Sequence, residues 1–158
     1  MIKIIAVGKL KEKFFDDAVS EYSKRLSAYT KLEIKEVADE KIPEKFSDAE
    51  ALKAREKEGE RILKNIRDNE YVVTLEILGK TMDSEGFAGF INDLNINGKP
   101  DITFVIGGST GLSGQVSSRA DCKLSFSKMT FPHQLMRVVL LEQIYRAFKI
   151  MRGETYHK

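Results

Sequence analysis

The sequence contains a single cysteine, Cys122, among 158 residues. One thiol excludes an internal disulfide and is typical of proteins in a reducing compartment. No neighbouring pattern marks Cys122 as a nucleophile, so we interpret it as a buried strand residue. We therefore expect a cytoplasmic protein that is stabilised by its hydrophobic core rather than by cross-links.

Long hydrophobic runs are absent as well. No stretch of about 18 apolar residues is present, which excludes a transmembrane helix of the usual kind. The first residues, MIKIIAVGKL, lack both a basic leader and a cleavage site, so we expect no signal peptide. Repeats, low-complexity segments and linkers are also missing, and the length predicts one domain over residues 1–158.

The usual short motifs of metal and nucleotide sites are missing. His133 and His157 have no cysteine pair and no histidine four residues away, so we expect no metal site. LGKT (78–81) looks like the end of a P-loop, but Thr74 stands where that motif needs glycine. GGSTGL (107–112) lacks the G-x-G-x-x-G spacing of a Rossmann site. An ordinary doubly wound nucleotide enzyme is therefore disfavoured.

Strand and helix patterns alternate along the chain. Strands are predicted at 2–7, 32–37, 71–77, 101–108 and 123–127. Helices are predicted at 11–28, from a Ser47–Glu50 capping box to Ile66, from Asp83 to Leu94, at 112–119, and from Pro132 to Met151. This order predicts an α/β fold with a five-stranded, mostly parallel sheet and helices on both faces. The alternating segment 32–37 suggests a strand near the sheet edge.

Ligands of such sheets bind beyond the carboxyl ends of the strands. The loops after Leu75, Ile106 and Phe126 are therefore the candidate binding region. Gly107, Gly108 and Gly111 in the second loop allow two interpretations. They permit a close approach of backbone to ligand, or they form a tight turn that requires positive φ.

Charge is distributed unevenly. Residues 119–158 contain 8 Lys and Arg against 3 Asp and Glu, so this part of the chain is basic. It could bind phosphate groups, or it could be a lysine-rich surface exposed to solvent. Residues 53–61, KAREKEGER, predict the solvent-exposed face of another helix.

The last predicted helix is apolar around almost its whole circumference, which indicates burial on more than one side. A single sheet covers one side, so we predict a homodimer formed through this helix. Glu142 and Arg146 have the spacing of an intrahelical salt bridge. His133, at the helix start, is either a functional residue or a cap.

Four segments together carry a family resemblance: AVGKLKEK, FVIGGSTGL, LSFSKMTFPHQLMRVVLLEQIYRAFKI and the terminal YHK. Over essentially its full length the sequence resembles the RlmH family. These are SPOUT-class methyltransferases that act on pseudouridine in large-subunit ribosomal RNA.

The resemblance implies a C-terminal trefoil knot, a homodimer and S-adenosylmethionine (SAM) as methyl donor. It implies methylation at N3 of a pseudouridine in 23S rRNA. Because N3 lies on the Watson–Crick edge, we expect an unpaired base in a hairpin loop. Because the chain has no separate RNA-binding domain, we expect the assembled ribosome to be the substrate. By motif position, the donor-binding residues are Leu75, Gly107, Phe126, Ser127, Lys128, Met129, Thr130 and Phe131.

Catalytic roles are expected at both ends of the last helix. His133 and His157 are candidate bases for the N3 proton, and Glu142 is a weaker one. In a dimer, Tyr156 of the C-terminal tail could stack on the target base at the partner's site. The candidates for holding RNA phosphates are Arg137, Arg146, Lys149, Arg152 and Lys158. A non-catalytic ribosome-associated factor and a SPOUT enzyme for another nucleotide are the alternatives.

Overall fold

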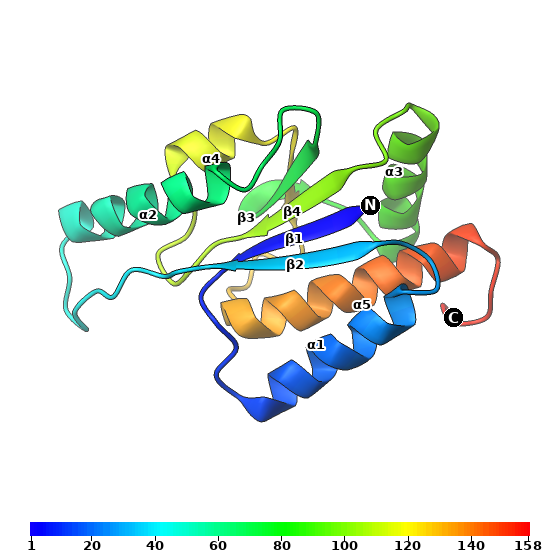
Figure 1. Cartoon of the computed structure of the whole chain (residues 1–158), viewed down its shortest axis with the longest axis horizontal. Coiled ribbons are helices and arrows are strands. Elements are labelled where there is room, and N and C mark those ends of the chain that lie inside the picture. Colours follow the sequence, from blue (N-terminus) through cyan, green and yellow to red (C-terminus); the bar gives the residue numbers. More distant parts are fainter.

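A computed structural model describes all residues from 1 to 158, and its centre is one parallel five-stranded sheet (Figure 1). The strand order is β2-β1-β4-β3-β5. The strands are β1 (Ile2–Val7), β2 (Leu32–Val37), β3 (Tyr71–Thr81), β4 (Ile102–Ile106) and β5 (Cys122–Ser125). Every strand pairing is parallel, which confirms the predicted sheet.

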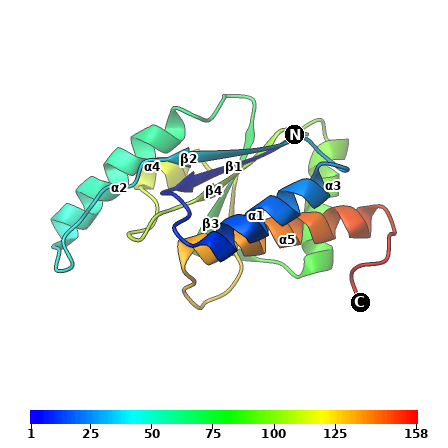
Figure 2. The same cartoon turned by 60° about the horizontal axis from the view of Figure 1, so that its bottom comes forward.

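Helices cover both faces of this sheet, as Figure 2 shows from a second direction. The larger hydrophobic cluster packs α1 (Lys13–Leu26), α3 (Ser84–Ile96) and α5 (His133–Met151) on one face. The smaller cluster packs α2 (Asp48–Leu63) and α4 (Gly114–Arg119) on the other. The predicted α/β class with two helical layers is therefore confirmed.

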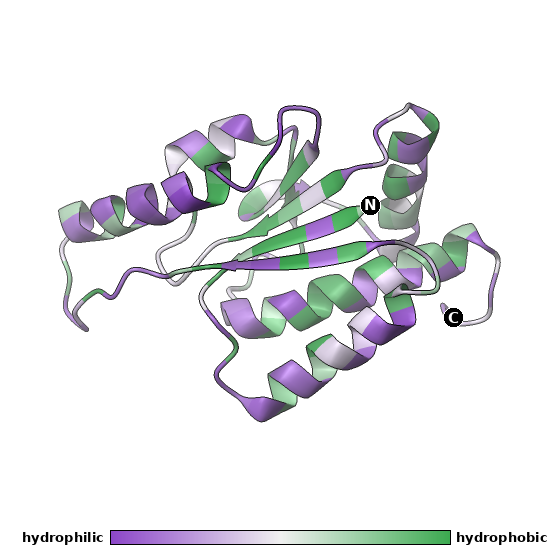
Figure 3. Cartoon of the chain, in the orientation of Figure 1, coloured by the Kyte–Doolittle hydropathy of each residue, from purple (hydrophilic) through white to green (hydrophobic).

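Burial along each strand follows its position in the sheet. All residues of β1 and β4 are buried, as expected for parallel strands with helices on both faces. β2 alternates between partly buried and exposed residues and lies at the sheet edge, as predicted. Figure 3 shows the same contrast in hydropathy between the central strands and β2.

Two predicted helix starts are confirmed by their caps, whereas the middle of α2 differs from expectation. Ser47 and Glu50 form the capping box, and the Asp83 carboxylate accepts the amide proton of Gly86. In α2, however, Glu58 and Gly59 are buried against the sheet and α4. A Cβ at Gly59 would lie 2.3 Å from Oγ of Ser113, so glycine permits this close packing.

The third strand runs longer than predicted because it contains a bulge. Leu75 and Lys80 both pair with Leu124 of β5, so residues 76–79 project out of the ladder. A Cβ at Gly79 would lie 2.7 Å from the backbone carbonyl atoms of Lys123. The glycine of LGKT therefore allows β3 to approach β5 and does not belong to a phosphate loop.

Helix α5 lies between α1 and α3. These two helices cover sides of α5 that we expected a second chain to cover. Leu140, Leu141, Ile144 and Ala147 are fully buried within one protomer. The apolar character of α5 is thus largely explained inside the protomer. The homodimer, the knot and the single-domain organisation stay predictions. None of the helices combines the length and apolar character needed to span a bilayer.

Candidate functional site

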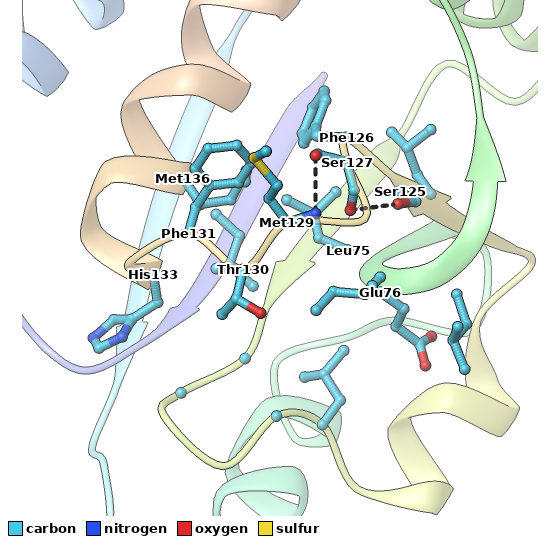
Figure 4. A pocket seen from close by; sticks show the side chains of 18 of the residues that line it. Leu75, Glu76, Ser125, Phe126, Ser127, Met129, Thr130, Phe131, His133 and Met136 are labelled. Atoms are coloured by element: carbon cyan, nitrogen blue, oxygen red, sulfur yellow. Dashed lines mark hydrogen bonds between the residues drawn. The ribbon is translucent and has the colours of Figure 1, made fainter.

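A cavity of about 490 Å³ opens beside the bulge of β3 and the carboxyl ends of β4 and β5 (Figure 4). Its lining comes from three segments, 75–78, 106–112 and 124–131, together with His133 and Met136 at the start of α5. These segments include the three loops that the parallel sheet singled out. The volume lies within the range of small-molecule and cofactor sites.

Most of the residues expected to bind the donor line this cavity. They are Leu75, Gly107, Phe126, Ser127, Met129, Thr130 and Phe131. Lys128 is exposed and is not part of the lining. The structure thus brings together residues up to 56 positions apart, because the bulge of β3 lies beside the carboxyl ends of β4 and β5.

The glycine-rich segment forms the tight turn that its sequence allowed. Gly111 has a φ of +86°, which favours glycine, and its amide donates to the carbonyl oxygen of Gly108 across 3.1 Å. Gly107 is needed for a close approach: a Cβ there would lie 3.0 Å from the carbonyl carbon of Gly111. The segment is a compact turn that exposes backbone to the cavity.

The segment after β5 is held in shape by serine hydroxyls. Ser125 donates to the carbonyl oxygen of Ser127 across 3.1 Å, and Oγ of Ser127 accepts the amide proton of Met129 across 3.0 Å (Figure 4). Apolar side chains project from this fixed segment: Met129 is 73% exposed and Phe131 is 39% exposed. Exposed apolar groups at a cavity mouth indicate a surface that a ligand or partner covers.

One polar lining residue, Glu76, was not found from the sequence. Its carboxylate accepts hydrogen bonds from Thr74 across 2.6 Å and from Ser117 across 2.9 Å. These contacts join the bulge of β3 to α4 and thereby fix one wall of the cavity. No sequence signal connects residues so far apart along the chain.

His133 is a half-buried residue at the cavity edge, where α5 begins (Figure 4). Burial lowers the pKa of its imidazole below the ordinary value, the charge of Arg137 lowers it further, Asp39 opposes this in part, and Lys11 adds the smallest lowering effect. The ring is therefore neutral at physiological pH. A neutral imidazole can accept a proton from a bound group.

Arg137, predicted to hold an RNA phosphate, lies one turn after His133 on α5 and does not line the cavity. It is 1% exposed and forms an ion pair with Glu36 at 2.6 Å. It also donates to the carbonyl oxygen of Gly8 across 3.1 Å. These contacts join the first turns of α5 to the ends of β1 and β2. Within one protomer Arg137 therefore holds in place the part of α5 that carries His133.

The other predicted catalytic residues form a second cluster, near the C-terminal end of α5. A carboxylate oxygen of Glu142 accepts from Nε of Arg146 across 3.0 Å and from the Tyr156 hydroxyl across 3.1 Å. The Arg146 guanidinium lies over the Tyr156 ring, 4.7 Å from its centroid, and within 3.2 Å of Nδ1 of His157. Burial and the Glu142 charge raise the pKa of Tyr156 to about 12, so its hydroxyl stays protonated.

Within one protomer these two groups are far apart. Thirteen residues separate His133 from Arg146 on α5, which corresponds to about 20 Å along the helix axis. None of the cluster residues lines the cavity. The tail is held in this cluster by its contacts with Glu142 and Arg146, away from the cavity of its own chain.

The predicted phosphate-binding residues differ in their availability. Lys149 is paired with Glu154 at 2.6 Å, and the Arg152 guanidinium lies 4.6 Å from the centroid of the Tyr29 ring. Lys158 is exposed and has no ion pair. No three His, Cys, Asp or Glu side chains gather as a metal site.

Nearly the whole chain matches a known protein family. Residues 1–157 match the family described as "Predicted SPOUT methyltransferase". The chain belongs to this SPOUT methyltransferase family. Relatives from Clostridium tetani and Enterococcus faecalis, 61% and 59% identical over 99% of each chain, are both named ribosomal RNA large subunit methyltransferase H. A relative from Methanococcus maripaludis is 65% identical over the same share of both chains.

Among solved structures, Lpg2936 from Legionella pneumophila, determined with bound SAM, has a TM-score of 0.49. Its sequence is 13% identical, and the alignment covers 92% of this chain and 65% of that one. The assignment to the family rests on the sequence matches and not on this structure. The predicted SPOUT membership is confirmed, and with it the assignment of the chain as a methyltransferase.

Proposed function

We propose that the chain transfers a methyl group from SAM to N3 of a pseudouridine in a hairpin loop of 23S rRNA, on the assembled ribosome. The observation that carries this proposal is the cavity between three backbone segments, with a neutral histidine at its edge. The relatives named as large-subunit rRNA methyltransferases support the choice of RNA. Such a substrate places the protein in the cytoplasm.

The residues of the cavity suit SAM. When bound, SAM supplies a methyl group already activated on a sulfonium. Leu75, Phe126 and Met129 offer apolar surface to an adenine ring, and the turn at Gly107 presents backbone groups to the polar parts of the molecule. The chain mainly has to hold the donor and the base in line, since alignment provides much of the rate enhancement in such a transfer.

His133 is the base that we favour for the N3 proton. N3 lies on the Watson–Crick edge and carries a proton that must leave when the methyl group arrives, so the target base has to be unpaired. The imidazole of His133 lines the cavity and is neutral at physiological pH. It can therefore accept this proton without first releasing one of its own.

A homodimer would complete the site. The cavity mouth exposes Leu78 (99%) and Met129 (73%), which a second chain could cover. In this arrangement the partner's tail reaches over the cavity, Tyr156 stacks on the target base, and Glu142 and His157 approach the reacting edge. Arg146, Arg152 and Lys158 then contact RNA phosphates.

Mass spectrometry of 23S rRNA tests the activity. We expect RNA from a strain without this protein to lack one methyl group on a pseudouridine, and the wild-type gene to restore it. Unchanged RNA would contradict the proposal, and a methyl group lost from a different nucleotide would indicate another SPOUT specificity. Calorimetry with SAM separates an enzyme from a non-catalytic ribosome-binding factor, which has no reason to bind the donor.

A further inference from the structure

We propose that Lys9 and Lys11, in the loop between β1 and α1, bind RNA phosphates beside the nucleotide that enters the cavity. This inference rests on the proposed function, because it names part of the RNA surface of the same site. The loop lies outside the basic C-terminal region to which the sequence assigned RNA binding.

The loop is held against the site by three local features. Gly8 turns the chain with a φ of +85°, and Leu10 packs against the larger hydrophobic cluster. The amide of Lys11 donates to Oε1 of Gln134 across 2.9 Å, which fixes the loop to the first turn of α5. Figure 1 shows the loop passing this end of α5 on its way to α1.

The two lysine side chains are exposed and available. Neither forms an ion pair, whereas nearby Lys13 is paired with Asp17 at 2.9 Å. Because only one residue, the partly buried Leu10, stands between them, the backbone positions of Lys9 and Lys11 are at most about 7 Å apart. Two cations at this spacing can contact neighbouring phosphates of one RNA strand.

The loop is also close to the cavity edge. A Cβ at Gly8 would lie 3.9 Å from Nε2 of His133, and Lys11 is near enough to affect the pKa of that imidazole. Two acidic residues are near this turn: Asp39, also 3.9 Å from that Cβ position, and Glu12, which follows Lys11 in the chain, and neither forms an ion pair with Lys9 or Lys11. The cations thus stay free beside the entrance.

Phosphate is the group that this arrangement fits. Lysines act as mobile point charges that contact phosphate without reading sequence. At the C-terminal cations Arg146 and Lys149 a phosphate would compete with Glu142 and Glu154, whereas Lys9 and Lys11 have no acidic partner. Lys9 and Lys11 therefore provide free positive charge at the cavity edge next to His133.

Salt-dependent binding to large ribosomal subunits from a strain lacking the protein tests this inference. We expect the Lys9→Ala/Lys11→Ala double variant to bind roughly tenfold or more weakly, with a slope of log K against log salt reduced by about 1.4. Lys9→Arg/Lys11→Arg should retain binding. The matched control Lys13→Ala should stay within about twofold of wild type, because Lys13 already has a partner.

The outcomes separate this inference from the proposed function. Affinity for SAM, measured by calorimetry, should be equal in all variants. An unchanged salt slope in the double alanine variant, with wild type still methylating its target, would overturn the inference alone. Wild-type protein that methylates no rRNA would instead overturn the proposed function. An equal loss in Lys13→Ala would show a general charge effect and would also overturn the inference.

Discussion

At the scale of residues, environment rather than residue type decides which polar side chains can act. His133 and Arg137 lie one turn apart on α5, yet the histidine faces the cavity while the arginine is buried on Glu36 and Gly8. Environment also limits Glu142 and Arg146, because the two side chains form an ion pair with each other within the protomer. Of the predicted catalytic side chains, only His133 reaches the cavity of its own chain.

Replacing His133 with alanine tests its role as the base. We expect His133→Ala to lower kcat by roughly 10²- to 10⁴-fold, as is typical for loss of a general base. Because the pKa of His133 is lowered, wild-type kcat/KM should rise with pH only below about 6.5 and be level at neutral pH. Rates of methyl transfer by the wild type and by His133→Ala, measured over this pH range, check the loss in kcat and the pH profile. Weaker SAM binding with unchanged turnover would assign His133 to binding.

At the scale of elements, the bulge in β3 shapes the cavity. Residues 76–79 leave the ladder between two pairings with the same residue, Leu124. This places Ile77 and Leu78 at the cavity mouth and lets Glu76 reach Ser117 on α4. The bulge depends on Gly79, where the backbone of β5 leaves no room for a side chain.

The Gly79→Ala variant should therefore lose stability and SAM affinity together. The added Cβ would clash with backbone that cannot rotate away, and such overpacking costs about 1–3 kcal/mol of unfolding free energy. Gly89→Ala is the matched control: nothing lies within 4 Å of its Cβ position in α3, and we expect a gain of up to about 1 kcal/mol. Denaturant titration and calorimetry measure both. Equal stability of the two variants would contradict this account of the bulge.

At the scale of the whole molecule, one protomer holds the cavity and His133, while Tyr156 and His157 lie near the far end of α5. In the structure the Tyr156 hydroxyl and the His157 ring hold the tail against Glu142 and Arg146, away from the cavity. A dimer in which each tail serves the other chain's cavity accounts for both groups.

Removing residues 155–158 should abolish methylation and leave the dimer intact, as judged by activity and sedimentation. Mixing this truncated chain with His133→Ala chains gives a sharper test. If the tail acts on the partner, mixed dimers contain one complete site and activity returns. If each tail serves its own chain, every site lacks one group and the mixture stays inactive. Full activity of the truncated chain alone would remove the tail from the mechanism.

The sequence by itself determined the order and type of every element, because hydrophobic periodicity and caps such as Ser47–Glu50 act locally. It also located the cavity, since parallel strands place their carboxyl ends at one edge. Only the tertiary structure revealed the bulge at Gly79, the burial of Arg137 and the free lysines beside His133. These depend on contacts between residues distant in the chain, and neither periodicity nor local propensity encodes which side chains meet there.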